Sequence, residues 1–144
     1  MKTVLAPGVW DCFHIGHLQH LHAARKLGDE LVVSVTPAKF VNKGPGRPIF
    51  SDEERLEMIR ALRIVDHVYL EKERCGVDII NEVMPDIYVC GLEYLGAMPF
   101  EVSDILASFE CECRYLSTRT TYSTTKIITG ELLRERIGNF VESL

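Results

Sequence analysis

The sequence has no long hydrophobic run, little positive charge and no internal repeat. None of its apolar stretches, in 144 residues, approaches the roughly 20 residues needed to cross a bilayer. The N-terminus lacks the apolar length and the cleavage site of a signal peptide. We therefore expect a cytoplasmic protein without a membrane partner. Lys and Arg (16) are outnumbered by Asp and Glu (21), and the net charge of -5 argues against a nucleic-acid partner.

Cysteine is present but does not form a disulfide or metal pattern. The five cysteines are Cys12, Cys75, Cys90, Cys111 and Cys113. Their number is odd and the chain is not a small loop-rich one, so reduced thiols are expected. Cys111 and Cys113 alternate along a predicted strand and face the same side. No second pair has matching spacing, so we interpret both as core residues and expect no metal ligated by protein side chains alone.

The pattern of apolar residues predicts alternating strands and helices. Strands are expected over 3–8, 30–36, 65–71, 85–91 and 111–117, and helices over 15–27, 51–65, 76–84, 100–109 and 123–144. Such alternation implies right-handed crossovers and a parallel sheet covered on both faces. The length fits one domain, 1–144. We predict an α/β, Rossmann-like three-layer sandwich with a five-stranded parallel sheet.

Helix boundaries can also be predicted from the residues at the ends. Gly28 is a plausible C-cap of the first helix, and Ser51 with Glu54 forms a capping box for the second. Gly130 and Gly138 weaken the last helix. The residues expected to face the core are Ile15, Leu18, Leu21 and Ala24 in the first helix, Leu56, Ile59, Ala61 and Leu62 in the second, and Ile128, Leu132, Leu133, Ile137 and Val141 in the last.

The topology predicts where a ligand binds. In sheets of this kind the ligand lies at the carboxyl ends of the strands. The segments at these ends of the predicted strands are 7–17, 36–48, 90–94 and 117–125. The first of these ends in "HIGH", with His14 and His17 at the start of a helix, whose free N–H groups and partial positive charge suit a phosphate. A capped helix with solvent-facing imidazoles is the alternative. Zinc binding is a further alternative, because His14, His17 and His20 repeat every three residues. These positions drift around the helix axis by about 60° per step, however, so three ligands on one face are not expected.

The resemblance to a known family rests on these residues. "GVWDCFHIGHL" resembles the "GTFDxxHxGHL" opening of the cytidylyltransferase branch of the HxGH nucleotidylyltransferase superfamily, and "VDHVYL" and "STTKI" recur in the same order. The resemblance runs from residue 4 to about residue 128 and extends to the heptose-phosphate nucleotidyltransferase domain. It implies the HUP-type fold, a homodimer, and transfer of CMP from CTP, with Mg²⁺, to a small phosphorylated alcohol or sugar, as in glycerol-3-phosphate cytidylyltransferases.

The same resemblance implies the site residues. His14, His17, Lys43 and Arg119 are expected to be catalytic. Nucleotide binding is expected of Gly8, Val9, Trp10, Asp11, Gly16, Arg47, Gly91, Glu93, Tyr94, Ser123, Thr124 and Thr125. Nucleotidyl transfer needs positioning and stabilisation of phosphoryl charge rather than covalent chemistry. An imidazole donor that becomes or stays charged is expected to fit better than a permanent cation, because the product must leave.

Several of these residues have a structural alternative. Asp11 either orients a histidine, binds metal-bound phosphate through water, or forms an Asx turn. Trp10 either packs beneath the nucleotide or fills the core, which we prefer. Lys43 and Arg47 either bind the β- and γ-phosphates or are ordinary charges of a solvated loop. For Arg55 we prefer a structural salt bridge, and we interpret His20 as a surface or packing residue.

The segment after Arg119 is one residue shorter than "RTEGISTTKI" of the family, so the role of each hydroxyl from Ser123 to Thr125 stays open, and one of them is expected to be an N-cap. Residues 94–110 are expected to shape the acceptor pocket.

Two other functions are kept. One is adenylyl transfer from ATP to a sugar phosphate, such as heptose 1-phosphate, or to FMN. The other is a non-catalytic nucleotide-binding regulator.

Overall fold

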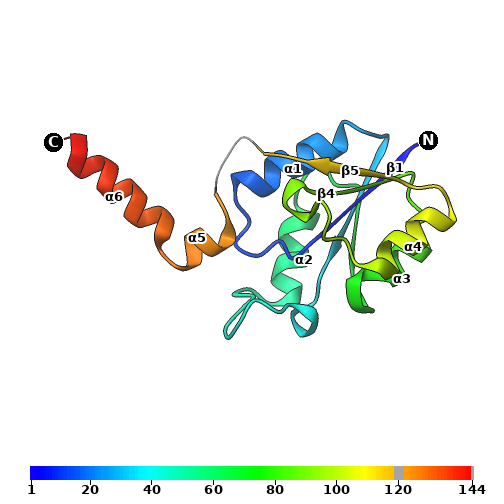
Figure 1. The fold of residues 1–144 in the computed structure, drawn as a ribbon, viewed down its shortest axis with the longest axis horizontal. Helices are drawn as coiled ribbons and strands as arrows, with labels where there is room; N and C mark the ends of the chain where they lie inside the picture. The colour runs from blue at the N-terminus through cyan, green and yellow to red at the C-terminus, as the bar shows by residue number, and fades with distance from the viewer. Residues whose placement is uncertain (119–121, 144) are drawn as a thin grey trace.

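The computed structural model describes residues 1–118 and 122–143, which form a five-stranded parallel sheet with helices on both faces (Figure 1). The strands are β1 (Thr3–Gly8), β2 (Glu30–Val35), β3 (His67–Leu70), β4 (Ile87–Gly91) and β5 (Glu112–Leu116). The helices are α1 (Ile15–Arg25), α2 (Asp52–Arg60), α3 (Val77–Val83), α4 (Phe100–Ser108), α5 (Thr124–Ile128) and α6 (Glu131–Ser143), with 3₁₀ turns at Ala38–Phe40, Arg74–Gly76 and Leu92–Tyr94. The predicted α/β fold is confirmed.

The strand order β3-β2-β1-β4-β5 places β1 in the middle of the sheet. From β1 the chain winds outward through β2 to β3, then returns to the other side of β1 for β4 and β5. The direction of winding therefore reverses between β1 and β4, where the loops that leave the two strands diverge. Sheets of this kind bind ligands in the crevice beyond the carboxyl ends of the strands at such a point.

Alternate residues of the strands pack on opposite faces of the sheet. On one face, Leu21, Ala24, Leu56 and Ile59 of α1 and α2 pack on Val4, Ala6, Val33 and Val89. On the other, Ile79, Ile80, Val102 and Leu106 of α3 and α4 pack on Leu5, Val32 and Tyr88. These two cores make the three layers. Cys75, Cys90, Cys111 and Cys113 pack against the second core, which confirms the core interpretation of Cys111 and Cys113.

Two of the predicted helices are shorter than expected. The first ends at Arg25 with Lys26 as the C-cap, so Gly28 is not the cap. Gly28 instead allows close approach, because a Cβ there would lie 2.7 Å from Val4 Cγ2 and 2.8 Å from the Lys2 carbonyl oxygen. Ile15 is 45% exposed, so its predicted place in the core is wrong. The second helix ends at Arg60, which leaves Ala61 exposed.

The predicted C-terminal helix is broken in two. Gly130 adopts a left-handed conformation with φ +74°, which a helix interior does not allow, and it separates α5 from α6. Beyond this glycine α6 extends away from the sheet (Figure 1). Leu133 and Ile137 are 63% and 52% exposed, so they do not face the core as predicted. Ile128 and Leu132 are half-buried, and the side chain of Val141 lies outside the described residues.

Candidate functional site

A cavity of about 690 Å³ opens at the carboxyl-terminal edge of the sheet. The segments after all five strands contribute to its lining, which is where the topology predicts a ligand. It is lined by every residue predicted to bind the nucleotide except Arg47, and by three of the residues predicted to be catalytic, His14, His17 and Lys43. The fourth, Arg119, lies outside the described residues.

The two histidines of "HIGH" cap the first helix with their own side chains. His14 is the N-cap, and its Nδ1 accepts a hydrogen bond from the Gly16 N–H at 3.0 Å. His17 Nδ1 accepts from the His14 N–H at 3.2 Å. The two rings stack with their centroids 3.9 Å apart. Since Nδ1 is the acceptor in both rings, each neutral imidazole carries its proton on Nε2, the nitrogen left for a ligand.

Both imidazoles are held uncharged in the free protein. The pKa of His17 is lowered to about 3, chiefly by burial and also by the neighbouring His14, His20 and Lys43, while Asp11 opposes the shift. Burial also lowers the pKa of His14. His14 Nε2 is buried and has no hydrogen-bond partner within the described ranges. The free site therefore presents neutral N–H donors rather than imidazoles that are already charged, because a second positive charge beside Lys43 is costly in a desolvated position.

The loop after β1 is shaped by Trp10 and Gly8. Trp10 is 5% exposed and its Nε1–H donates to the Ser34 carbonyl oxygen at 3.0 Å. Its backbone has φ +57°, and Cys12 has φ +46°, a region that non-glycine residues rarely adopt. A Cβ at Gly8 would lie 2.6 Å from the indole ring. Trp10 is therefore a core residue, as preferred, and the wall on which His17 rests, with ring centroids 5.5 Å apart.

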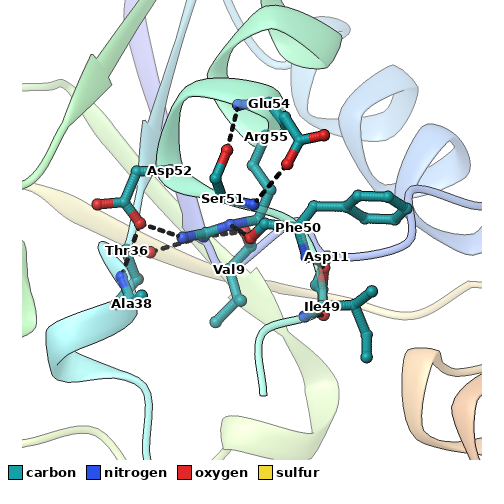
Figure 2. Close-up of polar contacts among 10 residues, drawn as sticks. All are labelled: Val9, Asp11, Thr36, Ala38, Ile49, Phe50, Ser51, Asp52, Glu54 and Arg55. Carbon is teal, nitrogen blue, oxygen red and sulfur yellow. Dashed lines mark hydrogen bonds and ion pairs between the residues drawn. The ribbon is translucent and has the colours of Figure 1, made fainter. Parts of the chain in front are cut away.

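Asp11 is neither a ligand of the histidines nor part of an Asx turn. It is 3% exposed, and its two carboxylate oxygens accept hydrogen bonds from the backbone N–H groups of Ile49 (2.7 Å) and Phe50 (3.1 Å). This contact joins the loop after β1 to a segment 38 residues later (Figure 2). Asp11 thus fixes the end of the loop that carries Lys43 and Arg47.

Lys43 and Arg47 lie close enough to Asp11 and to each other for their charges to interact. Burial lowers the pKa of Lys43, and the Arg47 guanidinium lowers it further while Asp11 opposes the shift. Lys43 lines the cavity. Arg47 lies behind it, and its Nε and Nη2 are buried without a hydrogen-bond partner among the residues described. An anion is the partner that two adjacent cations with unused donors would accept.

A buried arginine holds these loops in place. The Arg55 side chain is 1% exposed and donates to the carbonyl oxygens of Val9 (2.8 Å), Thr36 (2.7 Å) and Phe50 (3.0 Å), and it pairs with Asp52 at 2.6 Å (Figure 2). It therefore links the segments that follow β1 and β2 to the start of α2. The predicted structural salt bridge of Arg55 is confirmed, and the predicted capping box of Ser51 and Glu54 is present beside it.

The other end of the cavity is formed after β4. A Cβ at Gly91 would lie within 2.5 Å of the Glu93 carboxylate, the end of an exposed side chain that would have to move. Tyr94 is half exposed at the rim. His20 also lines the cavity, with its ring 6.0 Å from that of Trp10, and burial lowers its pKa while the Glu93 charge opposes the shift. His20 was interpreted as a surface or packing residue; its spacing of three from His17 is the signal that it faces the same side.

The three hydroxyl residues before the last helices have different structural roles. Ser123 is the N-cap of α5 and accepts from the Lys126 N–H at 3.1 Å, which confirms the expected cap. Thr124 is 8% exposed, and its hydroxyl donates to the Asp11 carbonyl oxygen at 2.8 Å. Thr125 lines the cavity and is exposed. The hydroxyls of Ser123 and Thr124 each make one structural hydrogen bond, so Ser123 can still donate to a ligand and Thr124 can still accept from one.

Part of the cavity lining, called the second lobe below, was not predicted from the sequence. Glu71, Arg74 and Cys75, after β3, and Tyr88 on β4 line it, together with Val102 on α4. The one signal in the sequence is that "VDHVYLE" places an acidic residue directly after a strand. Residues 94–110 do contribute, since Met98, Pro99 and Val102 are among the lining residues.

Two properties bear on metals and membranes. Among residues 1–118 and 122–143, no group of three or more His, Cys, Asp or Glu side chains is arranged to hold a metal ion. The carboxylate oxygens of Asp11 are both used by backbone N–H groups. None of the helices in the described part of the chain combines the length and the apolar character needed to cross a membrane.

Comparison with known proteins identifies relatives along most of the chain. A family model described as "Cytidylyltransferase-like" matches residues 5–130. The chain is 44% identical over 91 residues to an FAD synthase of Methanohalophilus mahii, covering 63% of each protein. It is 36% identical over 129 residues to the bifunctional protein HldE of Pseudomonas syringae pv. syringae, covering 88% of this chain and 27% of HldE. The chain thus spans less than two thirds of these relatives.

Comparison with solved structures supports the same relationship. The lipopolysaccharide core biosynthesis protein of Thermoplasma volcanium superposes with a TM-score of 0.65 at 30% identity, over 85% of this chain and 99% of that one. Pantothenate synthetase of Thermus thermophilus shares the fold, with a TM-score of 0.56 at 16% identity over 85% of this chain and 57% of that one. The "HIGH" helix cap, the cavity and the family model lead to the same conclusion. The chain belongs to the cytidylyltransferase-like family of the HxGH nucleotidylyltransferase superfamily.

Proposed function

We propose that the protein transfers a nucleoside monophosphate from a nucleoside triphosphate, ATP in first place, to a small phosphorylated acceptor, with release of pyrophosphate. The observation that carries this proposal is the pair of neutral imidazoles, His14 and His17, whose Nδ1 atoms are used by the helix cap. Their Nε2–H groups are then two fixed donors for the oxygens of the α-phosphate, where charge develops during transfer.

The chemistry needs little else from the protein. An oxygen of the acceptor phosphate attacks the α-phosphorus and forms the new P–O bond. The bond from that phosphorus to the bridging oxygen breaks, and its electron pair leaves with pyrophosphate. The attacking oxygen is already anionic, so no general base is required, which agrees with histidines that hold their protons. Lys43 and Arg47 supply positive charge for the departing pyrophosphate.

Mg²⁺ fits this site as a partner of the triphosphate rather than of the protein. The described residues offer no carboxylate cluster for it, and Asp11 is occupied by Ile49 and Phe50. Bound with the triphosphate, Mg²⁺ would supply positive charge that offsets the charge of the phosphates. Lys43 is the cavity residue best placed to share that task.

The choice of donor and acceptor is the finer part of the proposal. The name FAD synthase, carried by a relative 44% identical over 91 residues, favours ATP, because FAD contains an adenylyl group. The opening "GVWDCFHIGHL" and "STTKI" favour CTP with a polyol phosphate, the second candidate. Homodimerisation remains a proposal that follows from the family.

The experiment is a matrix of pyrophosphate-release assays. The protein is incubated with Mg²⁺, with ATP or CTP, and with FMN, a sugar 1-phosphate or glycerol 3-phosphate. Release that needs both ATP and an acceptor is expected, and release with CTP and glycerol 3-phosphate would establish the second candidate. Nucleotide binding without release for any pair would contradict the enzyme proposal and favour a regulatory nucleotide-binding protein.

A further inference from the structure

The second lobe of the cavity lies on the opposite side of the sheet from the histidines. Tyr88 and Val102, which line it, belong to the core under α3 and α4, whereas Trp10, beside His17, belongs to the core under α1 and α2. The cavity therefore passes over the carboxyl edge of the sheet at the point where the winding reverses. A ligand in the second lobe approaches the histidine lobe from the other face, as an acceptor must when it attacks a bound triphosphate.

Glu71 is a buried acid without a cation. It is 3% exposed, and its Oε1 accepts from the Ser34 hydroxyl at 2.9 Å. Within residues 1–118 and 122–143 no Lys, Arg or His forms an ion pair with it. Burial raises its pKa, against hydrogen bonds from the Ser34 and Thr36 hydroxyls, and Asp78 raises it further. A carboxyl group has about four acceptor sites, so the two hydroxyls leave capacity for a ligand.

The loop after β3 is folded tightly around this carboxyl group. Gly76 has φ +65°, and a Cβ there would lie 2.8 Å from Glu71 Oε1. Cys75, the neighbouring residue, also has a positive φ of 62°. Strained backbone of this kind persists where the surrounding structure holds a functional group in place. Glu71 is thus fixed by its own loop as well as by β2.

The rest of the lobe combines apolar walls with one more polar group. Tyr88 is 7% exposed, and its hydroxyl is a polar group among the residues that line the lobe. Burial raises the pKa of Tyr88 and Glu71 adds to the shift, so the hydroxyl keeps its proton as a donor. Met98 and Val102 supply apolar surface opposite. Apolar walls with a few placed polar groups are typical of small-molecule binding sites.

We propose that Glu71 and Tyr88 determine the specificity for the acceptor by binding the hydrogen-bonding edge of a flat heteroaromatic ring, the end of the acceptor opposite its phosphate. The inference rests on the proposed function. The phosphate of the acceptor is assigned to the end of the cavity near His14 and Lys43, where the proposed triphosphate binds, whereas Glu71 is buried at the other end. A polyol would leave hydroxyls unpaired against Met98 and Val102, which is costly. FMN is a phosphorylated compound of the class inferred.

The test measures binding of FMN to the full chain without nucleotide, by quenching of flavin fluorescence. The variants are Glu71→Leu, Glu71→Gln and Tyr88→Phe, and Glu73→Gln is the matched control, an exposed acid of the same loop. We expect Glu71→Leu to weaken FMN binding about tenfold or more, and Tyr88→Phe to weaken it severalfold. Glu71→Gln, which still accepts from Ser34, should lose less than Glu71→Leu, and the control should bind as the wild type does.

The outcomes separate this inference from the proposed function. Equal FMN affinity in wild type, Glu71→Leu and Tyr88→Phe would overturn the inference. Absence of FMN binding, together with pyrophosphate release from glycerol 3-phosphate, would also overturn it and leave the transferase proposal standing. If FMN binding depends on Glu71 but no acceptor gives pyrophosphate release, the assignment of the ring-binding site holds and the transferase proposal fails. If Glu71→Leu does not fold, Glu71→Gln and Tyr88→Phe decide.

Discussion

The imidazole of His14 stacks on that of His17 with 3.9 Å between ring centroids, and each accepts a backbone hydrogen bond through Nδ1. The motif therefore does two tasks with the same pair of side chains. Nδ1 of each ring closes the first turn of α1, which replaces the usual Ser or Thr cap. Nε2 of each ring is left as a donor with a fixed direction. Helix capping and phosphate binding are linked, so the cap sets the geometry of the site.

A substitution that keeps the cap separates the two tasks. Gln at position N3 of a helix accepts from the N-cap N–H in the same way as His17 does, so His17→Gln should preserve the fold. It removes one imidazole donor, and we expect kcat to fall about 100-fold or more, the scale of losing one donor to a developing charge. Pyrophosphate release and thermal unfolding are measured together. An unfolded variant, or one with full activity, would contradict this division of tasks.

Acid should destabilise the protein through the buried histidines. The pKa of His17 is about 3 in the folded protein, against an ordinary value of about 6.5. Above pH 6.5 the His17 imidazole is neutral in both the folded and the unfolded protein, so the stabilisation is fully present. Between these values the unfolded chain binds a proton that the folded one does not, so the free energy of unfolding decreases as pH falls.

The size and the control of this effect follow from linkage. One such group contributes a slope of at most about 1.4 kcal/mol per pH unit. Urea unfolding at pH 7 and pH 5 should show a smaller loss for His17→Gln than for the wild type, because Gln does not titrate. Equal losses in the two proteins would mean that His17 is not held neutral by its surroundings.

Arg55 is the structural centre of the loops around the site. Arg55→Met leaves the carbonyl oxygens of Val9, Thr36 and Phe50 and the Asp52 carboxylate without their donor. We expect the free energy of unfolding to fall by about 3–5 kcal/mol, as for other broken buried pairs. Arg60→Met is the control: Arg60 is half exposed and lies 3.8 Å from Glu53, so its loss should cost about 0.5 kcal/mol or less. Chemical denaturation of both variants compares them.

Lys43 should act on the triphosphate and not on stability. Lys43→Met removes a charge from the cavity, and we expect kcat/KM for the nucleoside triphosphate to fall about 10- to 100-fold, the value of a charged hydrogen bond. Lys39→Met is the control, because Lys39 lies over the Phe40 ring and outside the cavity lining. Equal losses of kcat/KM in Lys43→Met and Lys39→Met would show that the overall positive charge of the loop, and not the position of Lys43, determines the effect on the triphosphate.

Local patterns in the sequence predicted the fold. The predictions were incomplete where contacts between residues far apart in the chain determine the structure. The buried strands and the cap at Ser51 are local, and both are confirmed. The backbone partners of Asp11 were not predicted, because they lie in a loop without a pattern, 38 residues away in the case of Ile49. Glu71 was missed because its importance comes from Ser34 on another strand. Gly130 was predicted only to weaken a helix, since its φ is set by the way α5 is anchored.

The most direct test of the central claim is the protonation state of the imidazole nitrogens, measured by long-range ¹H–¹⁵N NMR with and without a non-hydrolysable ATP analogue. At pH 7 we predict protonated Nε2 and unprotonated Nδ1 in His14 and His17, and shifts of both Nε2 resonances when the analogue binds. The exposed imidazole of His67, paired with Glu30, should not respond. Protons on Nδ1, or resonances of His14 and His17 that stay unchanged while the nucleotide binds, would contradict the account.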